Sequence, residues 1–238
     1  MDQQIKINGR EVFYSDCGHG PMIVFIHGWL ESHKTFDLIV NILSKKYRCI
    51  SIDLPGFGKS DPINNVTLNK ITRSVEKVVK KIGVTNYYLV GHSLGGAISL
   101  MYADKNSGAV KKLVLISPFV SFKQFSKLIF YLITNLIPVA ITKILKWKNP
   151  NLFAVNAFRI AYLLSSADLY KYLRRVRKDI LLVYGTRDSL LSIRPLQPLL
   201  GIMNNIHLAI FEDVRHYVFT YNSQELAEKI DKFFEKQK

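Results

Sequence analysis

Ser93, Asp188 and His216 are residues of three types that can together perform nucleophilic chemistry, and they occur in this order along the chain. A serine hydroxyl becomes a nucleophile when a histidine accepts its proton, and the histidine in turn needs a carboxylate that orients it. Each of the three follows an apolar run typical of a buried strand. Because the carboxyl ends of parallel strands gather the ligands of α/β sheets, the pattern predicts a catalytic triad at that edge.

Ser93 lies within Gly91-His92-Ser93-Leu94-Gly95, between a strand that ends near Val90 and a helix that begins at about Leu94. A strand that feeds directly into a helix forces its apex residue into a strained backbone conformation, and the glycines remove side chains where strand and helix meet. The helix N-terminus can stabilise developing negative charge. We therefore predict that Ser93 is the nucleophile, against the alternative of a tight turn with an incidental serine.

The predicted base is the histidine that follows the carboxyl end of the last apolar strand, at 206–214. His216 follows this strand in a polar loop, whereas His207 begins the same strand at the wrong end. His92 neighbours the nucleophile on the same corner and is expected to point elsewhere. His216 is thus the predicted base, with a surface histidine as the alternative.

The acid should also end a strand, and Asp188 follows the apolar run at 179–185. Asp168 lies in a helical region, and Glu212 and Asp213 crowd the loop of the base. The order serine, aspartate, histidine is the order that this architecture uses. Asp188 is the predicted acid, with a helix cap as its structural alternative.

The elements that must position these residues alternate along the chain. Near-continuous apolar strands that alternate with helices are typical of a mostly parallel sheet covered on both faces. The sequence predicts strands at 22–28, 47–56, 86–93, 110–118, 179–188 and 206–214, and helices at 34–46, 67–83, 94–106 and 223–236. The polar, alternating first sixteen residues predict one further strand.

The alternation is broken once, between strands, by some sixty residues with helical patterns and no clear strand. We predict a helical cap at 119–178, inserted into a core formed by 1–118 and 179–238. The uncharged stretch 128–142 is shorter than the roughly 20 residues that a membrane-spanning helix needs, and Pro138 interrupts it. A buried or lid helix pair is the preferred interpretation.

The composition limits the class of protein. The 238 residues are 48% hydrophobic and carry a net charge of +15, an excess that bears on association rather than on fold. Cys17 and Cys49 form neither a disulfide framework nor a metal motif. No signal peptide is evident, so a cytoplasmic location is expected. Aromatic and basic residues do not interleave as in a nucleic-acid module, so nucleic acid is not an expected partner.

Together these motifs resemble the α/β-hydrolase fold family, over about residues 11–234. The residues that carry the resemblance are the nucleophile motif at 91–96, the sequence His-Gly-Trp at 27–29, the turn Asp-Leu-Pro-Gly-Phe-Gly-Lys-Ser at 53–60, Asp188 and His216. The resemblance implies that backbone N–H groups of Trp29 and Leu94 hold an oxyanion, and that His27 and the Asp53 turn are structural. Family members that open epoxides or remove halides use an aspartate where this chain has Ser93. The resemblance therefore implies hydrolysis of carboxylic esters, with thioesters as an open alternative, through an acyl-serine and with neither a metal nor an organic cofactor.

The motifs are also similar to those of pimeloyl-carrier-protein methyl ester esterases, in which a basic helical cap receives an acidic acyl carrier protein. Residues 119–180 contain seven lysines, four arginines and two aspartates. The densest group of these charges, here called the basic cluster, consists of Lys171, Arg174, Arg175, Arg177 and Lys178. It could bind such a carrier or an anionic membrane surface, or it could be a solvated basic face.

Apolar residues of the predicted cap could line an acyl channel, although most such stripes are packing surfaces. The candidates are Phe122, Phe125, Phe158 and Tyr162. They favour a medium or longer acyl group, and with the basic charge they also suit a lysophospholipase or monoacylglycerol lipase. A different class stays open: a non-catalytic ligand receptor on the same fold. Hydroxynitrile lyases and cofactor-free haloperoxidases share the triad, so the reaction type is open too.

Overall fold

A computed structural model describes residues 2–83, 85–121, 124 and 150–236 of the chain. It contains one eight-stranded sheet with the order β1-β2-β4-β3-β5-β6-β7-β8. The strands are β1 (Asp2–Ile7), β2 (Arg10–Cys17), β3 (Met22–Ile26), β4 (Arg48–Ile52), β5 (Tyr87–His92), β6 (Val110–Ile116), β7 (Ile180–Gly185) and β8 (Ile206–Phe211). From β4 onward across the sheet all neighbours pair in parallel. The predicted α/β class with a mostly parallel sheet is confirmed.

The N-terminal segment forms two strands where the sequence analysis predicted one. β1 and β2 pair antiparallel, and Ile7 lies opposite Arg10 across the two-residue turn of Asn8 and Gly9. Both turn residues have positive φ values, 51° and 76°. Asn-Gly is the preferred pair for a tight hairpin turn of this kind, so the alternating run folds back on itself.

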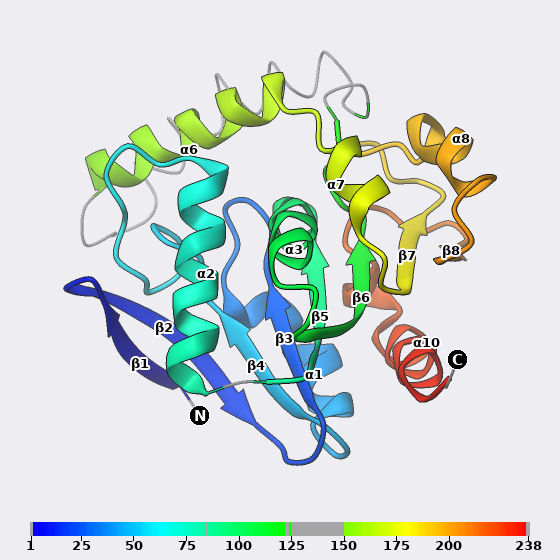
Figure 1. The fold of residues 1–238 in the computed structure, drawn as a ribbon, viewed down its shortest axis with the longest axis horizontal. Coiled ribbons are helices and arrows are strands. Elements are labelled where there is room, and N and C mark those ends of the chain that lie inside the picture. The colour runs from blue at the N-terminus through cyan, green and yellow to red at the C-terminus, as the bar shows by residue number, and fades with distance from the viewer. Residues whose placement is uncertain (1, 84, 122–123, 125–149, 237–238) are drawn as a thin grey trace.

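Helices cover both faces of the sheet, as a doubly wound architecture requires (Figure 1). On β3 the alternation is direct: Ile23 and Phe25 pack with one set of core residues, and Val24 and Ile26 pack with the other. One face carries α1 (Asp37–Leu43), preceded by a 3-10 turn at His33–Phe36, together with α10 (Ser223–Glu235). The other carries α2 (Leu68–Ile82) and α3 (Leu94–Lys105).

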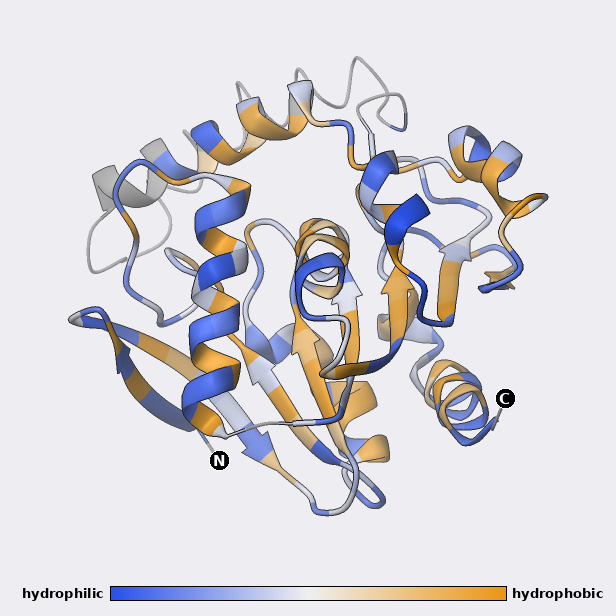
Figure 2. Ribbon diagram, viewed as in Figure 1, coloured by the Kyte–Doolittle hydropathy of each residue, from blue (hydrophilic) through white to orange (hydrophobic). Residues whose placement is uncertain are grey.

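The helix α2 has an apolar inner face and a polar outer face. Figure 2 shows α2 with hydrophobic residues toward the sheet and hydrophilic ones on the outside, and largely hydrophobic central strands. Its buried residues, among them Ile71, Val75, Val78 and Val79, recur at the spacing of a helical face. The helix begins after a Thr67 side chain that accepts a hydrogen bond from the Lys70 backbone N–H, and it ends at Gly83 in a left-handed conformation.

Between β6 and β7 the described residues contain two helices, α6 (Pro150–Ser166) and α7 (Tyr170–Arg175). In Figure 1, α6 crosses the molecule beyond the carboxyl ends of the central strands. Its buried residues 157, 160, 161 and 164 form one face. Residues 128–142 lie outside the described part of the chain. Among the helices that the structure describes, none is long and apolar enough to cross a membrane.

Three short elements complete the fold beside the carboxyl ends of β7 and β8. They are a 3-10 turn at Arg194–Leu196, α8 (Gln197–Leu200) and α9 (Val218–Tyr221). Periodicity did not predict them because each is only three or four residues long, less than two full helical turns.

Candidate active site

Ser93 lies at the sharp corner between β5 and α3. Its φ of 51° and ψ of −113° are strained for a residue that carries a side chain. Gly95 makes the corner possible, since a Cβ there would lie 2.0 Å from the carbonyl oxygen of Ile26 and 2.5 Å from that of His27. The first turn of α3 thus packs directly on the end of β3, and Ser93 is held at the carboxyl edge of the sheet.

Asp188 and His216 meet at the same edge, as the sequence predicted from their positions after β7 and β8. His216 Nδ1 lies 2.8 Å from Asp188 Oδ2, and both side chains are buried. The loop of Asp188 is held against the loop of His216 by backbone bonds, in which Thr186 donates to Phe211 and Arg187 donates to Val214. The pair is therefore built by two neighbouring strands of the sheet.

The electrostatics of this pair give His216 the form that a base needs. Burial opposes ionisation of Asp188, but the hydrogen bond and the charge of His216 hold the pKa of the carboxyl below its ordinary value. Burial lowers the pKa of His216, partly offset by Asp188. At neutral pH Nδ1–H donates to an ionised carboxylate, which leaves Nε2 with a free lone pair.

The ring of His92 links the base to the corner of Ser93. Its centroid lies 4.7 Å from that of His216, and His92 directly precedes Ser93 in the chain. The contact fixes the ring of His216 against the residue beside the serine. The sequence analysis expected that another histidine than His92 is the base. The packing of His92 against the ring of His216 agrees with that expectation.

The two predicted oxyanion donors lie at the ends of β3 and β5. Neither the backbone N–H of Trp29 nor that of Leu94 donates a hydrogen bond to another residue that the structure describes. Leu94 opens α3, where the unpaired N–H groups of a helix favour negative charge. An oxyanion between the two loops would need two such N–H groups without another partner.

Backbone strain gathers along this edge. Four residues other than glycine have positive φ values in the loops after β3, β5, β6 and β8: Leu30, Ser93, Ser117 and Asp213. Each such conformation costs of order 1 to 3 kcal/mol, and strain of this kind concentrates at functional sites. The four strand ends therefore mark the same edge as the triad residues do.

Glu31 is a site residue that the sequence analysis missed. Its carboxylate accepts a hydrogen bond of 2.8 Å from the Gly28 backbone N–H and lies 3.0 Å from His92 Nδ1. Burial works against its charge, but His92, His27 and the Gly28 N–H lower the pKa of Glu31 to about 2. Burial and the nearby charge of Glu31 raise the pKa of the Tyr217 phenol. One buried carboxylate thus ties the loop of Trp29 to the corner of Ser93.

His27 and Asp53 have the structural surroundings that the sequence analysis expected. His27 Nδ1 donates to the Gly28 carbonyl, because Nε2 accepts a bond of 2.9 Å from the Leu54 N–H. The buried Asp53 carboxylate accepts bonds from His33 and from the Lys59 N–H. The turn after β4 is therefore fixed by hydrogen bonds within the protein.

The predicted channel residues are placed only in part. Phe122 and Phe125 lie outside the described residues, as does the side chain of Phe158 within α6. The Tyr162 side chain is 72% exposed. The prediction that Tyr162 lines an acyl channel gains no support, because successive residues of a helix turn by about 100° and Tyr162 follows the buried Ala161 onto an exposed face.

The basic cluster is also placed differently from the prediction. It runs along the flank of the molecule, because α7 begins beside Leu169, which bonds to Val120 beyond the end of β6, and leads down to the start of β7. Arg177 and Lys178 therefore lie at the amino edge of the sheet, opposite the triad. Arg175 forms a two-bond ion pair with Asp104 of α3. A charged cap directly over the site is not formed by these five residues.

The comparisons with known proteins agree with this fold. A family model described as the alpha/beta hydrolase fold matches residues 21–138. The bromoperoxidase from Bacillus anthracis superposes with a TM-score of 0.84 at 20% identity, over 99% of this chain and 100% of that chain. The esterase from Exiguobacterium antarcticum gives 0.83 at 22% identity, with coverages of 99% and 100%. The chain has the α/β-hydrolase fold.

Relatives by sequence are matched over shorter stretches. The AB hydrolase superfamily protein YisY of Bacillus subtilis is 39% identical over 109 residues, which are 44% of this chain and 41% of that protein. A non-heme haloperoxidase of Rhodococcus erythropolis is 33% identical over 112 residues, 46% of this chain and 41% of that one. The chain is thus matched over less than half the length of these relatives.

Proposed function

We propose that this chain is a serine hydrolase that cleaves carboxylic esters of apolar acyl groups through an acyl-serine intermediate. The observation that carries the proposal is the buried 2.8 Å contact between His216 Nδ1 and Asp188 Oδ2, formed at the sheet edge where Ser93 occupies a strained corner. Such a constellation is recognised by geometry and roles.

In the proposed reaction, Ser93 Oγ attacks the carbonyl carbon of the ester while His216 Nε2 takes the hydroxyl proton. The negative charge on the carbonyl oxygen is held by the N–H groups of Trp29 and Leu94. The bond to the leaving alcohol then breaks, and His216 returns the proton to the leaving oxygen. A water molecule, activated by His216 in the same way, releases the acid and restores Ser93.

Alternatives within the family use the same residues. Perhydrolysis is favoured by the similarity to the non-heme haloperoxidase, and a lysophospholipase or a carrier-linked methyl ester esterase would differ in the alcohol that leaves. The carrier-linked alternative gains no support from the basic cluster, because the cluster descends to the amino edge of the sheet. A receptor that binds an ester without cleaving it is the alternative of a different class.

Labelling of the nucleophile tests the proposal. A fluorophosphonate should add one label to the wild-type chain and none to Ser93→Ala, as measured by intact mass. Ser99→Ala, which changes a buried serine elsewhere in α3, is the matched control and should keep the label. An unlabelled wild-type chain would refute the proposal that the chain is a serine hydrolase. A series of p-nitrophenyl esters, run with and without peroxide, then separates hydrolysis from perhydrolysis and measures the acyl length.

A further inference from the structure

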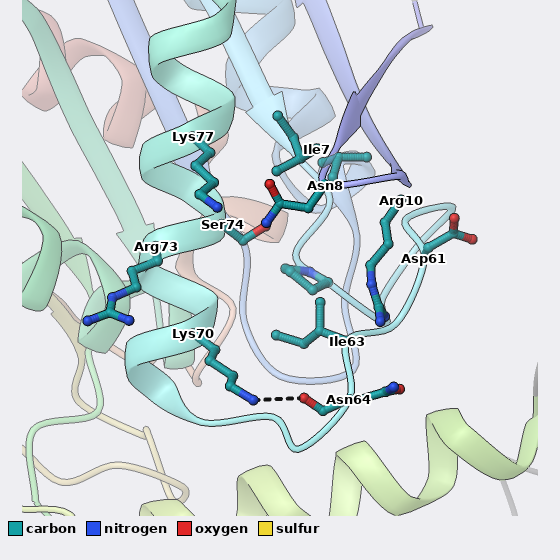
Figure 3. A pocket seen from close by; sticks show the side chains of 12 residues that line it. Ile7, Asn8, Arg10, Asp61, Ile63, Asn64, Lys70, Arg73, Ser74 and Lys77 are labelled. Carbon is teal, nitrogen blue, oxygen red and sulfur yellow. Dashed lines mark hydrogen bonds between the residues drawn. The ribbon is translucent and has the colours of Figure 1, made fainter.

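A hollow lies away from the triad, between α2, the turn of the β1–β2 hairpin and the loop after β4. It has a volume of about 400 Å³ (Figure 3). Its apolar wall includes Ile7, Val12 and Ile63. A cavity of this size and mixed character can hold a small organic ligand.

Positive charge dominates the polar part of this hollow. Arg10, Lys70, Arg73 and Lys77 line it, together with the single acid Asp61. Figure 3 shows Lys70 and Lys77 extending from α2 toward the loop and the hairpin, with Arg73 projecting to the other side at the rim. The lining is therefore a cluster of cations from two separate elements.

These cations are bonded to neutral groups. Arg10 donates to the Pro62 carbonyl, and Lys70 Nζ donates to the Asn64 carbonyl at 3.1 Å. Within the part of the chain that the structure describes, Lys77 and Arg73 form no ion pair. A carbonyl oxygen orients a cation but leaves its charge uncompensated, so the hollow retains a positive field.

The arrangement on α2 works against helix stability. Lys70, Arg73 and Lys77 are spaced three and four residues apart, where like charges on a helix repel each other. The one acid of this helix, Glu76, does not line the hollow. An anion bound between α2 and the hairpin would relieve the repulsion and join the two elements.

We propose that this hollow binds a phosphomonoester whose organic part rests on the wall of Ile7, Val12 and Ile63. A phosphomonoester carries nearly two negative charges at neutral pH and three acceptor oxygens, so it suits a lining with several cations better than a single carboxylate does. The amides of Asn8 and Asn64 and the hydroxyl of Ser74 add neutral partners for its oxygens. The source is either a soluble phosphate ester or the headgroup of a phosphatidic acid.

Calorimetric titration with phenyl phosphate tests the soluble source, and sedimentation with vesicles of phosphatidylcholine containing phosphatidic acid tests the lipid source. We expect saturable binding of at least one probe at one site, weakened at least fivefold by Lys70→Gln with Lys77→Gln. Lys80→Gln with Lys105→Gln removes the same charge outside the hollow and should change binding less than twofold. Binding should persist in Ser93→Ala, so the result of the binding test does not depend on whether the chain is a serine hydrolase.

A third variant separates the space in the hollow from its charge. Ser74→Phe fills the hollow without changing the charge and should also weaken binding at least fivefold. Equal loss in the two lysine pairs would show a response to net charge alone and overturn the proposal. Absence of saturable binding to both probes would overturn it as well.

Discussion

Asp188 uses its two carboxylate oxygens for different purposes. Oδ1 accepts the backbone N–H groups of Leu190 and Leu191 at 3.0 and 2.9 Å, and Oδ2 accepts Nδ1–H of His216. The turn thus fixes the acid, and the acid fixes the tautomer of the base. The helix-capping alternative is not realised, because the next helical turn begins at Arg194 and has no side-chain cap.

The pH dependence of catalysis should report His216. Its pKa is lowered below the ordinary 6.5, chiefly by burial, and the base is lost when the ring takes a proton. We expect kcat/KM for a p-nitrophenyl ester to fall as the pH decreases, with its midpoint below 6.5. A midpoint above 7 would contradict the assignment.

Asp188→Asn should reduce kcat by several orders of magnitude, since the wrong tautomer of His216 is then favoured.

Glu31 should matter to both activity and stability. Glu31→Gln removes a buried charge that joins the loop of Trp29 to the corner of Ser93, so we expect about 2 kcal/mol lower stability and about tenfold lower kcat. The folded pKa of about 2 lies below the ordinary 4.5, so the contribution of the carboxylate is present above pH 4.5 and is lost as the pH falls toward 2.

Urea unfolding at pH 7 and pH 3 measures the stability effect of Glu31→Gln. The difference from wild type should shrink at the lower pH. The control is Glu228→Gln, on the exposed surface of α10, which should change stability by less than about 0.5 kcal/mol. An equal difference at both pH values would show that the charge of Glu31 is not the cause.

At the scale of elements, the site depends on how closely α3 approaches β3. Gly95→Ala would place a methyl group 2.0 Å from a backbone oxygen that cannot move independently of the strand. We expect a loss of about 2 kcal/mol or more in unfolding free energy and a large loss of activity, because the corner of Ser93 must shift. Gly108→Ala meets nothing within 4 Å and should be nearly neutral in the same thermal and kinetic measurements. Similar effects of both changes would contradict the close-approach argument.

At the scale of the whole molecule, charge and chemistry occupy different edges of the sheet. Arg177 lies near the start of β7, whereas the triad residues follow the carboxyl ends of β5, β7 and β8. Six strand residues span roughly 20 Å, well beyond the Debye length of about 8 Å at physiological salt. The basic cluster should therefore have little influence on a small neutral substrate.

Kinetics of the double variant Arg174→Gln with Arg177→Gln check this separation. Both side chains are exposed, and we expect kcat and KM for p-nitrophenyl butyrate to stay within twofold of wild type at 0.15 M salt. A fivefold rise in KM would show that the cluster reaches the substrate after all.

The sequence by itself determined the sheet and the strand end that carries each residue of the proposed triad. This was possible because strand and helix periods are local, and because parallel strands bring their carboxyl ends to one edge. It did not reveal the hairpin of β1 and β2, although Asn8-Gly9 was a readable signal.

Only the tertiary structure decided the partners of Glu31, the outward face of Tyr162 and the descent of the basic cluster along the flank. Glu31 and His92 are 61 residues apart in sequence, and they meet because β3 and β5 are neighbours in the sheet. No local pattern encodes such a meeting. It follows from the order of the strands, which places the ends of β3 and β5 side by side.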